Sequence, residues 1–558
     1  MKIFSIMLIA SLFVAGSMQS NAQESKQKWI NAKIKSMTLR QQIAQLFVIS
    51  CYPERGGKYL DEISNTVHDE QLGGIIWGEC SPSLCIETLN RLQSQMNIPL
   101  LVTIDAEWGV AMRFDSVVKF PQQLTLGAIE DNSLIYELGV EVARQCKTAG
   151  IHFNFAPVVD VNNNPDNPVI NMRSFGENKY KVTEKAYSYM KGMHDGGILT
   201  SLKHFPGHGD TDKDSHKELP TITHNKEHIN NTELYPFREL IKRGATGVMT
   251  AHLRVPALFK NDIPASQSKE ICTDLLQKKL KFKGLIITDA LEMKGALYNC
   301  DTSKVALYSL IAGNDILEIP INVKESIDEI EKAVKNGDIS KRYIRKKCKK
   351  ILAAKYDLGL HKGFYPVNPE GILERLNTEH AKELRMKLAD ASLTLLSNKN
   401  NFLPLNTAKI KYVEIGNGKT FKTQLQKYCE IDTVKLQSDA TAEITDSLVA
   451  NLSDETIVIG YHNTRSRPHA NFGMDTLMID FIDSLTTNKN VILVFFGNPY
   501  AISKFKNHEK FASIIVAYDN SDEAQICSAN AIFGKQKFKG KLPVSINDKY
   551  REDFGIIY

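Results

Sequence analysis

The sequence has little that would mark a membrane protein or a nucleic-acid-binding protein. Beyond residue 22, none of its apolar runs reaches the ~20 residues that a membrane-spanning helix needs. The charge is nearly balanced, with 69 Lys and Arg against 64 Asp and Glu, and the basic stretch Lys341–Lys350 has the spacing of a solvated helix face. Binding to nucleic acid would require a denser basic stripe interleaved with aromatic residues. We therefore expect no nucleic-acid partner and no membrane span.

The nine cysteines lack the pattern of a metal site or of a disulfide framework. Their number is odd, their spacing is irregular, and a chain of this size does not need disulfides to hold a core. Cys272 and Cys527 lie in apolar surroundings and are interpreted as small buried residues. Cys80 and Cys85 could pair in an oxidising compartment, which the spacing leaves open.

The N-terminus carries the pattern of a secretory signal peptide. Lys2 precedes the apolar run Ile3–Ala15, and Ser20-Asn21-Ala22 supplies the small residues of a cleavage site. We predict that residues 1–22 are removed, with cleavage near Ala22-Gln23. The mature protein is then secreted or periplasmic.

Eight short apolar runs alternate with amphipathic segments between residue 38 and about residue 320. Continuous apolar runs separated by helices are typical of parallel strands buried on both faces, and eight such units predict a (β/α)8 barrel. A doubly wound open sheet is the alternative, but no Gly-rich phosphate motif follows the first run. The runs are Leu46–Ser50, Gly73–Trp77, Leu100–Asp105, Ile151–Val159, Leu199–His204, Gly247–His252, Leu285–Asp289 and Asp315–Ile319. The helical segments include Ser133–Thr148, Val182–His194, Asn231–Lys242 and Ser268–Leu280.

A second, smaller α/β sandwich domain is predicted after the barrel. The barrel domain spans 23–358 and ends in a helical, basic segment, and 359–377 forms a Gly- and Pro-punctuated linker. Residues 378–558 form the second domain, whose expected role is to support the barrel. Its expected elements are the strands Ile410–Ile415, Thr456–Tyr461, Asn490–Phe496, Ser513–Tyr518 and Leu542–Ile546 and the helix Ala524–Phe533.

Polar residues gather where the barrel strands end. Active sites of (β/α)8 barrels lie at the carboxyl ends of the strands, so this clustering places the chemistry there. The residues are Asp105, Glu107, Asp160, Asn162, Lys203, His204, His252, Asp289 and Glu292. Of these, His252 is either a pocket residue or a structural residue of the rim, and Glu292 is interpreted as a carboxylate in the first turn of a helix.

The densest polar segment is Lys203–His216, which contains three His and three Asp. Pro206, Gly207 and Gly209 exclude regular structure and hold this loop in one shape. Imidazole and carboxylate groups suit metal ligation. They also suit hydroxyl binding and proton transfer in sugar chemistry. The residue types alone do not decide between a metal site and a sugar site.

Five segments resemble the bacterial β-N-acetylglucosaminidase branch of glycoside hydrolase family 3, in matching order. The resemblance is strong over residues 38–360, and in the second domain it lies chiefly at Gly540–Val544. The segments are Phe120-Pro121-Gln122 with Leu126-Gly127-Ala128, Phe155–Val161 with Asn167–Ile170 and Arg173–Gly176, Lys203–Thr211 with Asp214-Ser215-His216 and Leu219-Pro220, Gly284–Met293, and Ala312–Asp315.

This resemblance implies a retaining exo-β-N-acetylhexosaminidase that removes terminal β-linked GlcNAc from a carbohydrate. Retention requires a carboxylate nucleophile and an acid/base group. The resemblance assigns Asp289 as the nucleophile and Asp214–His216 as the acid/base pair, in which the imidazole titrates near neutrality. It implies no cofactor and no metal. It also assigns the sugar hydroxyls to Asp105, Arg173, Lys203 and His204, and His208 and Asp210 are expected to brace the loop.

One segment departs from the family pattern. Where the family commonly has Asp-Gln-Glu-Gly-Gly-Arg-Val, this chain has Asp105–Ala111, with an arginine delayed to Arg113. Trp108 stands within this segment and could stack on a sugar or pack in the core. The natural substrate stays open between cell-wall fragments, chitooligosaccharides and other glycans, and phosphate could replace water as the acceptor.

Three other functions compete with this hypothesis. A β-glucosidase is the alternative within the same family. A metal-dependent hydrolase built on His204, His208 and His216 would lose activity with a chelator. A non-catalytic carbohydrate-binding protein is disfavoured, because Asp289, Asp214 and His216 are all present.

Overall fold

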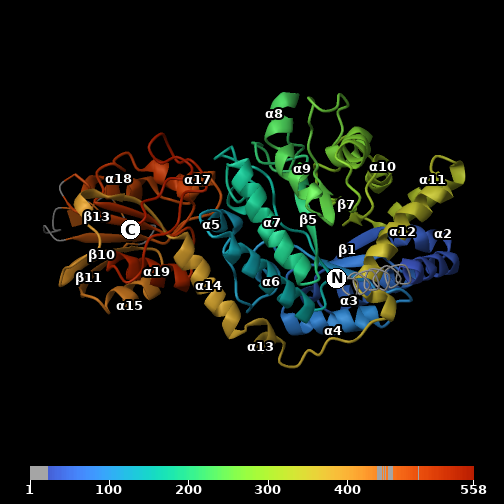
Figure 1. Cartoon of the computed structure of the whole chain (residues 1–558), viewed down its shortest axis with the longest axis horizontal. Helices are drawn as coiled ribbons and strands as arrows, with labels where there is room; N and C mark the ends of the chain where they lie inside the picture. Colours follow the sequence, from blue (N-terminus) through green and yellow to red (C-terminus); the bar gives the residue numbers. More distant parts are fainter. Residues whose placement is uncertain are drawn as a thin grey trace, which may run out of the picture.

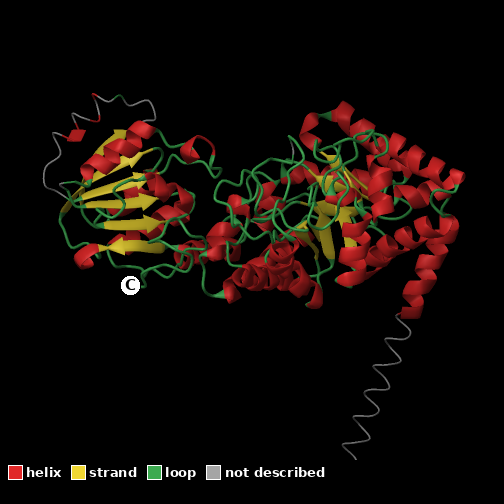
Figure 2. Ribbon diagram, turned by 90° about the horizontal axis from the view of Figure 1, so that it is seen from above, coloured by secondary structure: helices red, strands yellow, loops and turns green. Residues whose placement is uncertain are grey.

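The computed structural model describes residues 23–215, 217–436, 456–487 and 489–558, together with residues 441, 443, 445, 448 and 449. Figures 1 and 2 show two units joined by a connecting segment, a barrel surrounded by helices and a smaller layered domain. The predicted signal peptide, residues 1–22, lies outside the described residues. Within the described part of the chain, no helix combines the length and apolar character needed to cross a membrane.

The first unit is the predicted (β/α)8 barrel. Its strands run in parallel and pair in the order β7-β6-β5-β4-β3-β2-β1-β8, and a bridge between Ile287 and Ile316 joins the two ends of the sheet. Every residue of β2, β3, β6 and β7 is buried, which explains why the sequence shows continuous apolar runs there rather than alternation. The strands are β1(Phe47–Cys51), β2(Gly74–Trp77), β3(Leu101–Ile104), β4(Phe153–Asn154), β5(Leu199–Phe205), β6(Gly247–Thr250), β7(Leu285–Thr288) and β8(Leu317–Glu318).

Helices cover the outside of the barrel. Asn178 caps α7 by accepting hydrogen bonds from the backbone of Tyr180 and Lys181. Gly139 and Gly192 let α6 and α7 pack closely, since a Cβ at Gly139 would lie 2.4 Å from the Tyr189 carbonyl oxygen. The helical segments are α2(Leu39–Ala44), α3(Gly57–Glu70), α4(Pro82–Gln93), α5(Gln123–Gly127), α6(Asn132–Thr148), α7(Lys179–Asp195), α8(Lys226–Asn231), α9(Leu234–Lys242), η5(Glu270–Lys279), α10(Val305–Ala312), α11(Val323–Asn336) and α12(Lys341–Asp357).

The second unit is the predicted α/β sandwich. Its six strands pair in the order β11-β10-β12-β13-β14-β9, and all are parallel except β9, which runs antiparallel to β14. Separate hydrophobic clusters cover its two faces, one including residues of α18 and the other residues of α15 and α19. The elements are α14(Glu379–Ser392), β9(Thr394–Asn398), β10(Lys409–Ile415), α15(Lys419–Leu425), β11(Glu430–Leu436), β12(Ile457–Tyr461), α18(Thr476–Leu485), β13(Val491–Phe495), β14(Ser513–Val516) and α19(Asp522–Ile532).

Several predicted elements differ from the structure. The strand predicted at Leu542–Ile546 is wrong: Pro543 has no N–H for a ladder, and its carbonyl instead accepts a hydrogen bond from Glu177 in the barrel domain. The strands β9 and β11 were not predicted. The predicted helix Asn231–Lys242 is α9, which begins three residues later, at Leu234, and the predicted linker contains the helix α13(Ile372–Leu376). The structure pairs the sulfurs of Cys80 and Cys85, which the sequence left open.

The basic face of α12 is less solvated than its pattern indicates. Lys347 is buried and lies 2.8 Å from Asp315, and Lys350 also pairs with Asp315. Asp315 in turn accepts a hydrogen bond from the backbone N–H of Ile286 in β7. These lysines therefore anchor α12 to the barrel next to the strand that carries Asp289.

The second domain holds one loop of the barrel, residues 161–178. Asn498 donates a hydrogen bond of 2.6 Å to the side chain of Asn171. The Tyr500 hydroxyl contacts Asn162, and Ser545 donates to Glu177 at 2.5 Å. These contacts fix the loop that carries Arg173 into the barrel mouth.

Candidate active site

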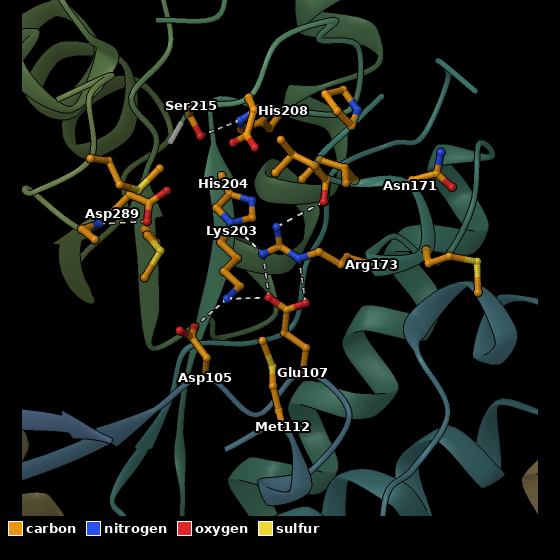
Figure 3. A pocket seen from close by; sticks show the side chains of 18 of the residues that line it. Asp105, Glu107, Met112, Asn171, Arg173, Lys203, His204, His208, Ser215 and Asp289 are labelled. Carbon is orange, nitrogen blue, oxygen red and sulfur yellow. Dashed lines mark hydrogen bonds and ion pairs between the residues drawn. The ribbon is translucent and has the colours of Figure 1, made fainter. Parts of the chain in front are cut away.

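A cavity of about 520 Å³ opens at the carboxyl ends of the barrel strands. Its size falls within the range of small-molecule sites. Figure 3 shows its charged side chains converging from several strands and loops. The polar residues that line it are Tyr52, Asp105, Glu107, Arg113, Gln122, Asn171, Arg173, Lys203, His204, His208, Asp214, Ser215, Asp289, Glu292, Glu318, Ser466 and Arg467.

A chain of ion pairs forms one wall of the cavity. Lys203, which is nearly inaccessible, lies 2.8 Å from Asp105 and 2.8 Å from Glu107. Arg173 binds both oxygens of Glu107, at 2.7 and 2.9 Å, and Arg113 lies 2.7 Å from Asp105. Charge-assisted, bidentate pairs of this kind fix side chains in direction as well as position. The wall therefore presents preset donors and acceptors to a polar ligand.

The electrostatics of this wall keep its carboxylates ionised. Burial raises the pKa of Glu107, but Arg173 and Lys203 outweigh burial and hold the pKa at about 2. Burial acts in the same way on Asp105, and Lys203 and Arg113 hold its pKa well below the usual range. Both groups are therefore hydrogen-bond acceptors at any physiological pH.

Asp160, which is fully buried, orients His204. Its oxygens accept hydrogen bonds from the backbone N–H groups of His204 and His208, and one of them lies 2.8 Å from Nδ1 of His204. When Nδ1 carries the proton, Nε2 is an acceptor, and Arg173 donates to it at 3.3 Å. Asp160 thus sets the direction of an imidazole that the sequence predicted as a sugar ligand.

Asp289 stands at the tip of β7, after four buried residues. One of its oxygens accepts a hydrogen bond of 2.9 Å from the Ala290 N–H. Burial raises the pKa of Asp289, but His204, His252 and the Ala290 N–H outweigh burial and lower it overall. The group is therefore an ionised carboxylate in a cavity, the state that an attacking nucleophile requires.

His252 positions this segment. Its ring nitrogens lie 2.8 Å from Ser266 Oγ and 3.0 Å from the Ala290 carbonyl oxygen. The side chain is fully buried. Of the two roles that the sequence left open for His252, these contacts match the structural one.

The loop that follows β5 is held in place by buried hydrogen bonds. Nδ1 of His208 lies 2.7 Å from Thr211 Oγ1, and the Asn167 side chain donates to the carbonyls of His208 and Gly209, both at 2.9 Å. Gly209 is required here, because a Cβ would lie 1.8 Å from the Val161 carbonyl oxygen. The loop carries Asp214 to the cavity. His216, the predicted partner of Asp214, lies outside the described residues.

Every other predicted site residue lines the same cavity: Asp105, Arg173, Lys203, His204, Asp214 and Asp289. The prediction that Glu292 lies in the first turn of a helix is wrong. Residues 291–300 form turns, α10 begins only at Val305, and Glu292 is exposed at the cavity. Trp108 also lines the cavity, next to the ion pairs.

Glu318 was not predicted as a site residue. It ends β8, so the strand-end rule that found Asp289 would also have found it. Burial, together with Asp105 and Asp289, raises its pKa well above the usual value. Glu318 is therefore harder to ionise than Asp105 and Asp289 beside it.

The second domain contributes Ser466 and Arg467 to the cavity. They follow β12 and lie in the same loop as Thr464, which donates to the Phe496 carbonyl oxygen at 2.9 Å. The expected role of this domain was structural support. The structure adds a direct contribution to the wall of the site.

Comparison with protein families gives two matches that together cover both domains. Residues 38–354 match the glycosyl hydrolase family 3 N terminal domain, and residues 393–554 match the C-terminal domain of that family. The chain belongs to glycosyl hydrolase family 3. It is a glycoside hydrolase.

Named relatives of this family 3 chain extend over most of its length. Beta-hexosaminidase A of Pseudoalteromonas piscicida is 28% identical over 87% of this chain and 91% of the relative. The Beta-N-acetylglucosaminidase/beta-glucosidase of Cellulomonas fimi is 23% identical over 92% of this chain and 95% of the relative. The solved structure of a family 3 beta-N-acetylglucosaminidase from Paenibacillus has a TM-score of 0.78 and 28% identity, and it covers 92% of this chain and 99% of its own.

Proposed function

We propose that this glycoside hydrolase is a retaining exo-β-N-acetylhexosaminidase that acts on terminal β-linked GlcNAc. The observation that carries the proposal is Asp289, a partly buried carboxylate whose surroundings lower its pKa, at the edge of a cavity lined by fixed donors and acceptors. In a retaining mechanism this carboxylate attacks the anomeric carbon and the bond to the leaving oxygen breaks. Water then attacks the glycosyl-enzyme and releases Asp289.

We assign the acid/base role to the Asp214–His216 pair. In the first step the imidazolium gives its proton to the leaving oxygen, and in the second step the neutral imidazole takes a proton from the attacking water. Asp214 supplies a carboxylate that orients the ring and stabilises its charged form. The position of Asp214 at the cavity supports this assignment.

We assign substrate binding to Asp105, Arg173, Lys203 and His204. Their ion pairs leave each group held by another protein group, so the site is organised before a sugar enters. Arg173 and Lys203 share Glu107, and the loss of either would leave a buried carboxylate with one partner fewer. The flat ring of Trp108 provides an apolar surface beside these polar groups.

The two alternatives from the sequence make different predictions. In the metal-dependent alternative, His204 and His208 would both bind the metal through Nε2, but Arg173 lies 3.3 Å from Nε2 of His204 and Ser215 Oγ lies 3.4 Å from Nε2 of His208. The β-glucosidase alternative would accept a hydroxyl instead of an acetamido group at the sugar C2 position, and its acid would be expected from the second domain instead of the Asp214–His216 pair. The name of the Cellulomonas relative includes both activities.

A side-by-side assay separates these functions. We expect release of nitrophenol from the aryl β-N-acetylglucosaminide with kcat/KM at least about 10-fold above that for the aryl β-glucoside, unchanged by EDTA. A higher value for the glucoside would identify a β-glucosidase. Loss of turnover with EDTA, restored by metal, would instead identify the metal-dependent enzyme.

His216→Ala tests the acid/base assignment. Poor leaving groups need protonation and good ones do not, so we expect a loss on the order of 10²–10⁴-fold for an alkyl leaving group and a much smaller loss for dinitrophenol. His208→Gln is the matched control within the same loop. Equal losses for both leaving groups in His216→Ala would reject His216 as the acid.

We further propose that the enzyme is exported after cleavage near Ala22-Gln23 and acts on cell-wall fragments or other GlcNAc-containing glycans. The N-terminal pattern supports export. Mass spectrometry of the protein from the periplasm or medium should give an N-terminus at or near Gln23. An intact Met1 in a cytoplasmic fraction would contradict export.

A further inference from the structure

A cluster of three side chains of metal-ligating types lies outside the cavity, on the segment that follows the loop after β5. We call this loop, residues 206–215, the catalytic loop, because it carries Asp214 of the proposed acid/base pair. His224, His228 and Glu233 each offer a ligand atom, and these atoms lie within 4.8 Å of one another. His224 and His228 are four residues apart, on either side of the Asn225 cap of α8, and Glu233 lies between α8 and α9. Figure 1 shows α8 and α9 at one end of the barrel. Neither the ion pairs of the cavity nor the proposed mechanism uses these groups.

Glu233 is the most deeply buried of the three side chains. Its side chain is 2% exposed, and the polar groups beside it include those of Asn163, His224 and His228. Nε2 of His228 lies 3.3 Å from one carboxylate oxygen. Burying a carboxylate costs free energy unless a cation or hydrogen-bond donors compensate it. A metal ion bound between Glu233 and the two imidazoles would supply this compensation directly.

Asp210 completes the arrangement. It pairs with Nε2 of His224, which leaves Nδ1 of that ring for a metal. Histidines that bind metals usually donate their other ring N–H to a carboxylate, which fixes the tautomer and the ring direction.

We propose that His224, His228 and Glu233 form a zinc-binding site, with Asp210 orienting His224. Imidazole and carboxylate donors suit Zn²⁺, and three protein ligands leave one tetrahedral position for water. With bonds of about 2.0–2.1 Å, tetrahedral ligand atoms lie roughly 3.4 Å apart, so the side chains need to close by about 1 Å. His224 and His228 are 32% and 38% exposed, which gives the ion a path and the rings room to turn.

The site would tie the catalytic loop to α8 from two sides. Asp210 belongs to that loop, four residues before Asp214. Glu233 packs against its other end, since a Cβ at Gly207 would lie 2.5 Å from the Glu233 Cβ. Zinc is thus a structural clamp on the loop rather than a participant in glycoside cleavage. The proposal does not depend on the identity of the sugar.

The test uses the full chain without a histidine tag, stripped with EDTA, dialysed and titrated calorimetrically with ZnCl₂ and separately with MgCl₂. We expect one Zn²⁺ per chain, no binding of Mg²⁺, and a higher Tm with zinc. Asp210→Asn should weaken zinc binding by about 10–100-fold, as an outer partner does, and His228→Ala by more. His68→Ala, an exposed histidine elsewhere, should change nothing.

A wild-type chain that takes up no zinc would overturn the proposal, as would equal zinc affinity in His228→Ala and wild type. Replacing zinc with Co²⁺ gives a test on the wild-type chain alone, so its result does not depend on whether a variant folds. The visible spectrum of the Co²⁺-loaded wild-type chain should be that of a four-coordinate site. A six-coordinate aqueous spectrum would contradict the proposed ligand set.

Discussion

The two parallel sheets of this protein use their carboxyl edges differently. In the barrel, that edge carries interlocked acids and cations such as Lys203, Asp105 and Glu107, which line the cavity. In the second domain, the same edge carries mostly neutral groups that hydrogen-bond to each other or to the barrel. His462 lies 2.6 Å from Asn520, and Asn498 bonds to Asn171 of the barrel loop.

The difference shows that strand polarity locates a functional edge but does not assign its function. Both carboxyl edges carry a cavity. The cavity of the second domain is lined by residues that include His462, Asn498 and Asp519. The barrel edge differs because it holds an ionised carboxylate, Asp289, beside cations in a buried setting. The second edge instead fixes the loop that brings Arg173 to Glu107.

Substituting the aspartate that follows a strand of each sheet, Asp289 in the barrel and Asp519 in the second domain, should give the largest difference in kcat between the two edges. Asp289→Asn should lower kcat on the order of 10⁴-fold or more, because it removes the carboxylate that we propose as the nucleophile. Asp519→Asn, after β14 at the edge of the second cavity, should change kcat less than about 2-fold. Steady-state kinetics on the aryl β-N-acetylglucosaminide measure both. Comparable losses in the two variants would remove the distinction between the edges.

The buried carboxylate Glu107 of the barrel edge should make unfolding sensitive to acid. The folded pKa of Glu107, about 2, lies below its unfolded value. Its stabilising contribution is therefore present above about pH 4.5 and is lost as pH falls towards 2, a total of about 3 kcal/mol. Glu107→Gln should remove this part of the pH dependence of unfolding, measured with denaturant between pH 2 and 7. An unchanged pH dependence in this variant would contradict the account of the ion-pair wall.

The contribution of the second domain to the cavity can be tested at Arg467. We expect Arg467→Ala to raise KM about 3–10-fold with kcat within 2-fold, since the side chain lines the cavity without touching the ion-pair chain. Arg551→Ala, an exposed arginine of the same domain, is the control. An unchanged KM would limit this domain to bracing the barrel.

Of these variants, Glu318→Gln should change activity least. It tests whether the barrel edge holds a carboxyl group that resists ionisation beside Asp105 and Asp289. The folded pKa of Glu318 is raised, so its acid form stabilises the fold below the unfolded pKa and this contribution is lost as pH rises. The neutral amide avoids this loss, and the variant should gain about 2–4 °C in Tm at pH 8 relative to wild type, with no gain at pH 4. A lower Tm at pH 8 would show that Glu318 is ionised.

Most of the barrel could be predicted from sequence because its strands are buried on both faces, as Leu285–Thr288 illustrates. The second domain was harder: β11 has only one buried residue, Leu436, so it lacks an apolar run. At the site, strand-end position found Asp289 and Lys203, and family resemblance added Asp214. Neither signal reveals that Arg173 and Lys203 share Glu107. These two residues lie 66 and 96 positions after Glu107 in the sequence, and only the fold brings them into contact with it. The cluster of Glu233 with His224 and His228 is likewise visible only once the fold is known.

Trapping of the glycosyl-enzyme tests the central claim most directly. A 5-fluoro-N-acetylglucosaminyl fluoride should accumulate as a covalent intermediate, and mass spectrometry of a peptic digest should find one sugar on the peptide that contains Gly284–Met293, attached to Asp289. Attachment to Glu292, Glu318 or Asp214 would contradict the assignment. Hydrolysis with inversion of the anomeric centre would contradict the mechanism itself.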